Sequence, residues 1–343
     1  MNAQNNETSP RVAVVVITHN GRHHLDECLT ALRAQTQGGF RTLLIDNAST
    51  DGAAEHVRAR FPWVEVLRND ENLGFAGGYN AAIAGLDADY VALLNDDTRP
   101  EPGWLAELVQ ALSRDPNLFA VGSRILLHDD PSRLNAAGGR ITLVGAGIDI
   151  GLGQPDGAEY QRPGPVGTLC GAAMLVRRSV FEDLGGFDPD YFAYCEDVDL
   201  CWRAWLRGYT VEYVPTSVVL HKLGGTFGGR RSPLRIRLGQ RNRLRTMLKN
   251  LGPLDLAVAV AVSGVYDLVR IGWWLRRGDR EFVRALLQGN GEVLRELGAL
   301  RRKRAEIQTH RVRTDRDLRR RGVVMGLGEA ILEYVRLERK RRK

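Results

Sequence analysis

The sequence predicts an α/β fold in which a mostly parallel β-sheet is flanked by helices. Apolar, β-branched runs such as VAVVVIT at 12–18 are typical of strands buried on both faces. These runs alternate along the chain with segments whose apolar residues recur three or four positions apart. Two of the runs end in the polar turns NASTDG and NDDT. This alternation is typical of a parallel sheet with helices on both faces.

The same patterns give the order of the elements. Strands are expected over 12–18, 42–46, 64–68, 90–94, 170–177 and 209–219. Helices are expected over 24–33, 53–60, 75–86, 103–113 and 196–207. From 124 to 167 glycine is frequent and the pattern is weak, so we expect loops or short strands that partly cover a binding site.

Charge is divided unevenly along the chain. The 343 residues include 48 Lys and Arg and 41 Asp and Glu, which gives a net charge of +7. Residues 1–229 hold 18 basic and 29 acidic residues, whereas residues 230–343 hold 30 basic and 12 acidic ones. We therefore predict a disordered N-terminus over 1–10, an acidic α/β domain over 11–229, and a basic helical region over 230–343 for membrane association or oligomerisation.

Composition limits the class of protein and its compartment. With 43% hydrophobic and 26% charged residues, the chain is neither disordered nor collagen-like. Residues 1–10 lack the basic and apolar segments of a signal peptide. The four cysteines include no CxxC pair, which favours free thiols in a reducing cytoplasm.

Polar residues follow three of the predicted strands. In parallel α/β sheets, ligands bind beyond the carboxyl ends of the strands, so Thr18, Asn20, Asp46 and Asn47 are candidate site residues. Asp46 is suited to accept hydrogen bonds from a base or ribose, although a turn or helix cap explains it equally well. The carboxylates in 95–97 (NDD) suit Mg²⁺ that bridges substrate phosphates, although an acidic turn is the alternative.

Two further segments contain candidate groups. The glycine-rich run 72–80 (NLGFAGGYN) opens a helix, whose N-terminus attracts anions, but it matches neither a Walker A loop nor GxGxxG. Glu196, Asp197 and Asp199 begin another helix, where the helix dipole is a sufficient structural reason for them. Asp199 and Arg203 are spaced to pair, which leaves Asp197 as a candidate general base.

His221 follows the apolar end of the last predicted strand. A single histidine is more often structural than a metal ligand. If His221 reaches the same site as Asp97, its neutral imidazole could complete a metal site.

Taken together, residues 11 to about 225 resemble the family-2 glycosyltransferases of the GT-A, Rossmann-like type. The resemblance lies in the ordered motifs VVVITHN, LLIDNASTD, NLGFAGGYN, LLNDDT, CGAAMLVRR, FEDLGGFDPDYFAYCEDVDLCWRAWLRGY and VVLHKLGG. NLGFAGGYN and LLNDDT look most like the rhamnosyltransferase branch, whose members use dTDP-L-rhamnose and act on cell-envelope glycans.

The resemblance implies a role for each matching residue. Donor-binding positions are Thr18, Asn20, Asp46, Asn47, Gly78, Asn80 and Asp96. The DxD element of the family, which holds Mg²⁺ or Mn²⁺ on the donor diphosphate, corresponds to 95–97 with its first Asp replaced by Asn95. The implied metal ligands are therefore Asp97, His221 and, as a weaker candidate, Asn95. Asp197 matches the catalytic base, and inversion of the anomeric centre is implied.

The expected activity is transfer of L-rhamnose from dTDP-L-rhamnose to a hydroxyl of a cell-envelope glycan or lipid-linked acceptor. Two alternatives remain open at this point. One is the same chemistry with another donor, such as UDP-galactofuranose or UDP-glucose. The other is a scaffold that binds a nucleotide-sugar but has lost catalysis.

The basic region contains an apolar segment, 254–275, that is long enough to span a bilayer. Charges within it oppose spanning, and a series of residues at spacings of three or four forms one helix face: Asp255, Ala259, Ser263, Asp267, Arg270 and Trp274. An amphipathic helix that lies on a membrane or packs on the α/β domain is therefore expected.

The remaining features of the basic region favour an anionic membrane as the partner. Trp273 and Trp274, followed by Arg276 and Arg277, suit a lipid interface, and basic clusters follow at 301–304, 319–321 and 339–343. We expect peripheral attachment to the inner face of the cell membrane. Solvated helix faces or a homo-oligomer are the alternatives, and nucleic acid is not expected because no binding fold is recognisable.

Overall fold

The computed structural model describes residues 10–222, 232–326 and 328–330. The predicted boundary at 229/230, nearly all of the predicted disordered segment 1–10, and the basic cluster at 339–343 lie outside the described residues.

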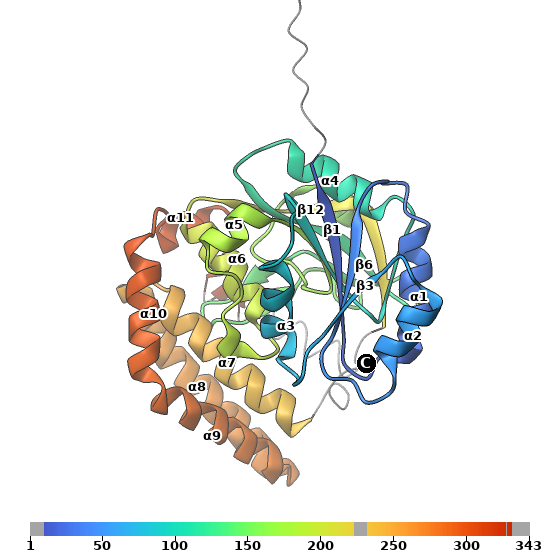
Figure 1. Cartoon of the computed structure of the whole chain (residues 1–343). Helices are drawn as coiled ribbons and strands as arrows, with labels where there is room; N and C mark the ends of the chain where they lie inside the picture. The colour runs from blue at the N-terminus through green and yellow to red at the C-terminus, as the bar shows by residue number, and fades with distance from the viewer. Residues whose placement is uncertain (1–9, 223–231, 327, 331–343) are drawn as a thin grey trace, which may run out of the picture.

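A ten-stranded sheet forms the centre of the described structure (Figure 1). Its main path runs through β10 (Gly164–Pro165), β12 (Thr210–His221), β6 (Leu118–Leu127), β11 (Ala173–Arg177), β4 (Tyr90–Asn95), β1 (Val12–Thr18), β2 (Arg41–Asp46) and β3 (Glu65–Arg68). The β4-β1-β2-β3 half is parallel, and β11 lies antiparallel between β4 and β6. The predicted α/β architecture is confirmed, with a parallel half and a mixed half in one sheet.

Helices cover both faces of this sheet, as the near-continuous apolar strands require. Alternate residues of β1 pack on opposite faces, Val14 against one hydrophobic core and Val15 against the other. The first core is shared with α1 (Arg22–Arg33), α2 (Ala53–Arg60) and α4 (Trp104–Ser113). The second is shared with α3 (Gly74–Ile83), α5 (Arg178–Asp183) and α6 (Glu196–Leu206).

The region from 118 to 167 contains more strand than the sequence indicates. β6 is ten residues long, but Gly122, Ser123 and Arg124 interrupt its apolar run and hide it from pattern analysis. The expected short strands follow: β7 (Leu134–Ala137), β8 (Gly139–Ile141), β9 (Gly147–Asp149) and β10. β5 (Thr98–Pro100) pairs with the end of β12 and places Thr98 opposite His221.

The expected helical C-terminal region is present. Its helices are α7 (Pro233–Asn250), α8 (Pro253–Arg277), α9 (Arg280–Arg295), α10 (Leu297–Thr309) and α11 (Asp315–Arg320), and they lie together beside α6 in Figure 1. Met247, Leu251, Ala259 and Leu318 from this region belong to the same hydrophobic core as α3 and α6. The helices therefore share a core with the α/β domain.

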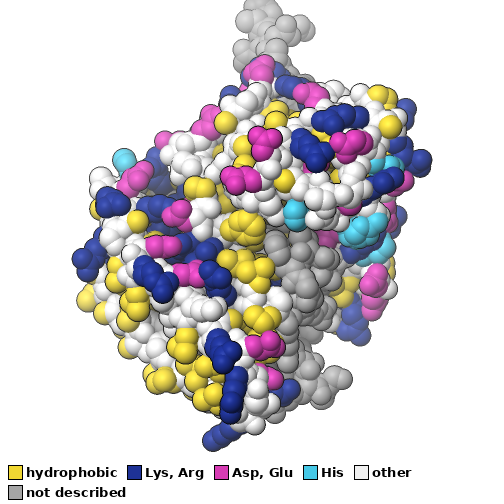
Figure 2. Space-filling view, turned by 60° about the horizontal axis from the view of Figure 1, so that its bottom comes forward, with side chains coloured by type: hydrophobic (Ala, Val, Ile, Leu, Met, Phe, Trp, Pro, Cys, Tyr) yellow, Lys and Arg dark blue, Asp and Glu magenta, His cyan; other side chains and the backbone are white. Residues whose placement is uncertain are grey.

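The segment 254–275 forms most of α8, which packs on the protein through its polar face. Ala259, Ser263, Asp267 and Trp274 are the buried residues of this helix. Among the described residues, no helix combines the length and apolar composition that crossing a membrane would require. The opposite, apolar face of α8 is exposed, on the side of the molecule where hydrophobic side chains lie among Lys and Arg (Figure 2).

Candidate active site

A cavity of about 470 Å³ opens at the carboxyl ends of β1 and β4. The predicted site residues among its lining are Thr18, Asn47, Asn95, Asp96, Asp97, Asp197 and His221. Asp149, Asn135, Cys170 and Arg235 also line it and were not recognised from the sequence. The cavity is where the strand-end rule predicts a ligand site.

Asp97 and His221 meet at one wall of this cavity. His221 Nε2 lies 3.3 Å from Asp97 Oδ1, because β5 pairs with the end of β12. His221 Nδ1 lies 2.6 Å from Asn135 Oδ1, and a hydrogen bond donated from Nδ1 to this oxygen would leave the Nε2 lone pair facing Asp97 Oδ1. Asp97 Oδ1 and Asn95 Oδ1 are buried without a hydrogen-bond partner in the described structure.

These groups fit a hard divalent cation that is completed by a substrate. Among the described residues, no three His, Cys, Asp or Glu side chains cluster closely enough to hold a metal on their own. Mg²⁺ commonly takes only one or two carboxylates and completes its shell with water and substrate phosphates. The pair of unpartnered oxygens beside His221 Nε2 is consistent with that arrangement.

Asp96 also lines the cavity, but its Oδ2 is taken by a contact with β1. Its Oδ2 accepts a hydrogen bond from Thr18 Oγ at 2.5 Å, and an added Cβ at Gly21 would lie 1.9 Å from the same oxygen. Burial, together with the charge of neighbouring Asp97, raises the pKa of Asp96 to about 7 despite the Thr18 bond. Asp96 therefore links β4 to the end of β1 rather than adding a metal oxygen beside Asp97.

Four predicted donor residues lie outside the cavity lining: Asn20, Asp46, Gly78 and Asn80. Each has a structural contact. Asp46 Oδ1 accepts from the Ser49 amide at 2.8 Å, and Asn20 Oδ1 accepts from the Thr50 amide at 2.8 Å. The Asn80 amide group pairs with the backbone N–H and C=O of Phe187. Gly78 lets α3 approach β1, since an added Cβ would lie 2.8 Å from Ile17 Cδ1.

Asp197 lines the same cavity from the start of α6. Its Oδ2 accepts from the Gly171 amide at 3.0 Å and its Oδ1 from the Val198 amide at 2.7 Å. Burial raises the pKa of Asp197 despite these bonds, and burial and the Asp197 charge raise that of Glu196 well above its usual range. A carboxylate held in this way, with a raised pKa, is suited to accept a proton from a substrate hydroxyl.

Asp149 is a further carboxyl in the same cavity, whose lining also includes Asp96, Asp97, Glu196 and Asp197. Burial, with a contribution from the Asp197 charge, raises its pKa to about 7. Asp149 ends the short strand β9, inside the glycine-rich region where no pattern drew attention to it. Only the folding of β9 beside β8 brings it to the site.

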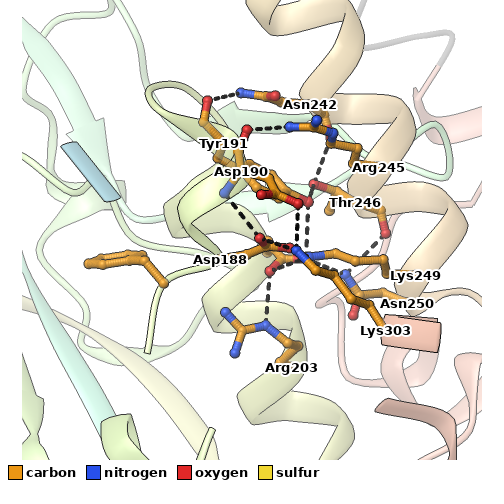
Figure 3. Close-up of polar contacts among 12 residues, drawn as sticks. Asp188, Asp190, Tyr191, Arg203, Asn242, Arg245, Thr246, Lys249, Asn250 and Lys303 are labelled. Atoms are coloured by element: carbon orange, nitrogen blue, oxygen red, sulfur yellow. Dashed lines mark hydrogen bonds and ion pairs between the residues drawn. The ribbon is translucent and has the colours of Figure 1, made fainter. Parts of the chain in front are cut away.

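Asp199, the third carboxylate of α6, is structural. Asp199 forms the expected pair with Arg203, at 2.9 Å, and a second ion pair with Lys249 of α7, at 3.0 Å. Lys249 and Lys303 both contact Asp188, at 2.7 and 2.6 Å (Figure 3). The C-terminal helices therefore hold both ends of the segment that leads from Asp188 into α6.

Comparison with known proteins identifies the chain as a glycosyltransferase and gives its family. The family model of glycosyl transferase family 2 matches residues 13–185, and the chain belongs to this family. The N-acetylglucosaminyl-diphospho-decaprenol L-rhamnosyltransferase of Mycobacterium tuberculosis is 36% identical over 230 residues, which is 61% of this chain and 75% of the relative. The pre-mycofactocin glycosyltransferase of the same species is 30% identical over 216 residues, 61% of this chain and 42% of the relative.

Solved structures confirm the GT-A fold. GalNAc-T7 with UDP, GalNAc and Mn²⁺ superposes with a TM-score of 0.57 at 18% identity, over 71% of this chain and 48% of the other. A mannosyltransferase from Pyrobaculum calidifontis in complex with GDP-Man and Mn²⁺ superposes with a TM-score of 0.53 at 19% identity, over 90% of this chain and 88% of the other.

The contacts of Asp188 predict how stability depends on pH. Burial alone would raise the pKa of Asp188, but Lys249 and Lys303 outweigh it and hold the pKa well below the ordinary 3.8. A carboxylate with a lowered pKa stabilises the fold above about pH 4, and that stabilisation is lost as the pH falls toward the lowered pKa. We expect Asp188→Asn to cost about 3 kcal/mol near neutral pH, because it removes a partner of a buried ammonium.

Thermal unfolding at several pH values measures this effect. The difference in melting temperature between wild type and Asp188→Asn should shrink as the pH falls from about 5 to 3. Asp183→Asn is the matched control, since Asp183 pairs with Arg207 at the surface, and it should change stability little. A difference that stays constant over this pH range would contradict the prediction.

Proposed function

We propose that the protein is an inverting, metal-dependent rhamnosyltransferase that moves L-rhamnose from dTDP-L-rhamnose to a hydroxyl of a lipid-linked glycan. The observation that carries this proposal is the convergence of Asp97, His221 and Asp197 on one cavity. The choice of sugar and acceptor is supported by the mycobacterial relative, whose name specifies rhamnosyl transfer to a diphospho-decaprenol acceptor.

Asp97 and His221, with Asn95 beside them, would hold Mg²⁺ or Mn²⁺, which when bound neutralises charge on the donor diphosphate as a Lewis acid. A hydrogen bond donated from His221 Nδ1 to Asn135 Oδ1 would leave Nε2 available for this role. Thr18, by holding Asp96, keeps the strand end in place under the donor. Asn47 supports the start of α3 by donating from Nδ2 to the Gly74 carbonyl at 2.8 Å.

Asp197 would act as the base. It takes the proton from the acceptor hydroxyl while that oxygen bonds to the anomeric carbon and the bond from this carbon to the diphosphate oxygen breaks. The electron pair of the breaking bond leaves with the nucleoside diphosphate. A single displacement of this kind inverts the anomeric centre.

We further propose that the chain works at the cytoplasmic face of a membrane that presents anionic lipid. A polyprenol-linked acceptor is embedded in such a surface, so a transferase bound there meets a concentrated substrate. The scaffold alternative predicts donor binding without turnover, and the donor alternative predicts turnover with a different nucleotide-sugar.

A donor panel tests the proposal directly. The full chain is mixed with dTDP-rhamnose, UDP-galactofuranose, UDP-glucose or GDP-mannose in the presence of Mn²⁺, and thermal shift and nucleotide release are measured. We expect dTDP-rhamnose to give the largest shift, since a ligand at about 100 times its Kd adds roughly 2.7 kcal/mol to stability. Chelation of Mn²⁺ and Asp97→Ala should both reduce the shift, whereas Asp129→Ala, at an exposed site, should not. A larger shift and faster release with a UDP-sugar would reject rhamnose as the substrate.

Two matched substitutions locate the base. Asp197→Asn should reduce kcat by about 10²–10⁴-fold, because it removes the proton acceptor, while the donor-induced thermal shift persists. Asp149→Asn changes another cavity carboxyl with a raised pKa and should retain most of the turnover. The opposite result would assign the base to Asp149, and wild-type turnover by both variants would reject the proposed mechanism.

A further inference from the structure

Helix α8 has its polar side against the protein and its apolar side toward solvent. Asp267 accepts from Gln240 Nε2 at 2.7 Å and pairs with Arg243, and Asp255 pairs with Arg319 at 2.7 Å. Both carboxylates of α8 are therefore paired with side chains of other helices. This orientation reverses the usual one for a helix on the surface of a water-soluble protein.

The outward face of α8 has no charge along most of its length. Every exposed residue between 253 and 275 is apolar or glycine. Leu254 and Leu268 are 86% and 70% exposed, and Val265 and Val269 lie with Leu268 on the same face. A helix of 25 residues is about 37 Å long, so this strip is larger than the scattered apolar residues of an ordinary surface.

Cations border the strip where α8 turns into α9. Arg276 and Arg277 end α8, and Arg277 lies over the ring of the exposed Trp273 at 4.7 Å. Arg280 and Arg284 are exposed on the first turns of α9. Figure 2 shows Lys and Arg side chains beside hydrophobic ones on this part of the molecule.

We propose that the exposed face of α8 docks on an anionic lipid bilayer, with the helix flat in the headgroup region. An apolar strip bordered by arginines and a tryptophan matches a bilayer whose acyl chains lie below a negatively charged surface. This inference deepens the membrane part of the proposed function and rests on it, but it is independent of the donor sugar.

Flotation with vesicles tests the docking face. The full chain is mixed with phosphatidylcholine vesicles containing about 30% phosphatidylglycerol, or with pure phosphatidylcholine vesicles. Val265→Glu combined with Leu268→Glu should lower the bound fraction at least about tenfold, because it puts charge at the centre of the buried strip. Val312→Glu is the matched control, since Val312 is 73% exposed but lies outside α8, and its binding should be unchanged.

The readouts separate this inference from the proposed function. Nucleotide release from the donor in solution should stay within about twofold for both variants, since these side chains are exposed and outside the cavity. Equal vesicle binding by the α8 variant and the wild type would overturn the proposed docking of α8 on a bilayer, regardless of which nucleotide-sugar is the donor. A wild-type dimer in sedimentation that the same variant converts to monomer, without vesicle binding, would assign the face to a second copy instead.

An independent set of contacts concerns the segment that leads into α6. Phe192, Tyr194 and Cys195 have φ values of 63°, 73° and 65°, a region that L side chains rarely adopt. Such backbone persists only where surrounding contacts impose it. The segment ends at Glu196 and Asp197, so its conformation sets the position of the proposed base.

Asn242 of α7 supplies those contacts from one side. It is fully buried, and its Nδ2 lies 2.8–2.9 Å from the carbonyl oxygens of Tyr191, Ala193 and Tyr194. On the other side, the Phe192 carbonyl accepts from the Phe75 amide at 2.6 Å, at the start of α3. The segment is therefore held between α7 and the glycine-rich start of α3.

The geometry points to Asn242 as a positioning residue for Asp197. Its side-chain amide contacts three carbonyl groups of the segment that comes just before Asp197 in the chain. This role rests on the proposed catalytic function of Asp197. Misplacement of a catalytic group by about 1 Å can cost on the order of 100-fold in rate.

Paired asparagine variants test this role. Asn242→Ala should reduce kcat by about 100-fold while the donor KM changes less than about threefold, because donor-side contacts remain. Asn242→Ser, which keeps one hydroxyl donor, should recover part of the lost kcat and guards against a variant that fails to fold. Asn290→Ser is the control, since Asn290 bonds Asp267 and Gln240 in the same helical layer but not this segment.

A loss of kcat in Asn290→Ser equal to that in Asn242→Ala would show that general destabilisation is the cause and overturn the positioning role. Unchanged kcat in Asn242→Ala would also overturn it. If Asp197→Asn keeps full turnover while Asn242→Ala loses it, the base assignment fails but the control of the segment by Asn242 stands.

Discussion

The buried ammonium group of Lys249 constrains how the acidic part of the chain, residues 1–229, packs against the basic part, residues 230–343. Lys249 is 1% exposed and lies between Asp188 and Asp199, which both belong to the acidic half. A buried cation without such partners would be strongly destabilising. Lys249 belongs to α7, whereas Asp188 precedes α6 and Asp199 lies in its first turn. The helical region must therefore pack on the α/β domain to keep the start of α6, and with it Asp197, in place.

This constraint changes how the basic region is interpreted. Many of its cations are not available to a membrane or any other partner. Arg243 pairs with Asp267, and Arg245 pairs with Glu296 while donating to the Asp190 carbonyl, in contacts within the protein. The net charge of residues 230–343 therefore overstates the charge presented to a partner, and the exposed arginines at the α8–α9 turn matter more than the total.

The sequence predicted those parts of the site that depend on strand ends. Asp97 and Asp96 follow β4 directly, and His221 ends β12, so the order of strands was enough to bring them to one edge. It did not predict Asn135 or Asp149, which reach the cavity through packing between elements far apart in the chain. Nor did it predict Asn242, which contacts the segment before Asp197 in the same way. Asn20, Asp46, Gly78 and Asn80 make contacts that support the backbone around the cavity, and their donor-binding role stays a prediction.

The orientation of α8 also depends on contacts that the sequence pattern could not predict. Periodicity identified its polar face correctly, yet both a membrane-bound and a protein-packed helix fit that pattern. The partners that decide between them, Gln240 and Arg243 on α7 and Arg319 on α11, are distant in sequence. Since these contacts satisfy the polar face within the protein, the apolar face is left to water or to another partner. The exposure of such a face costs free energy in water, and the lipid surface proposed above would remove that cost.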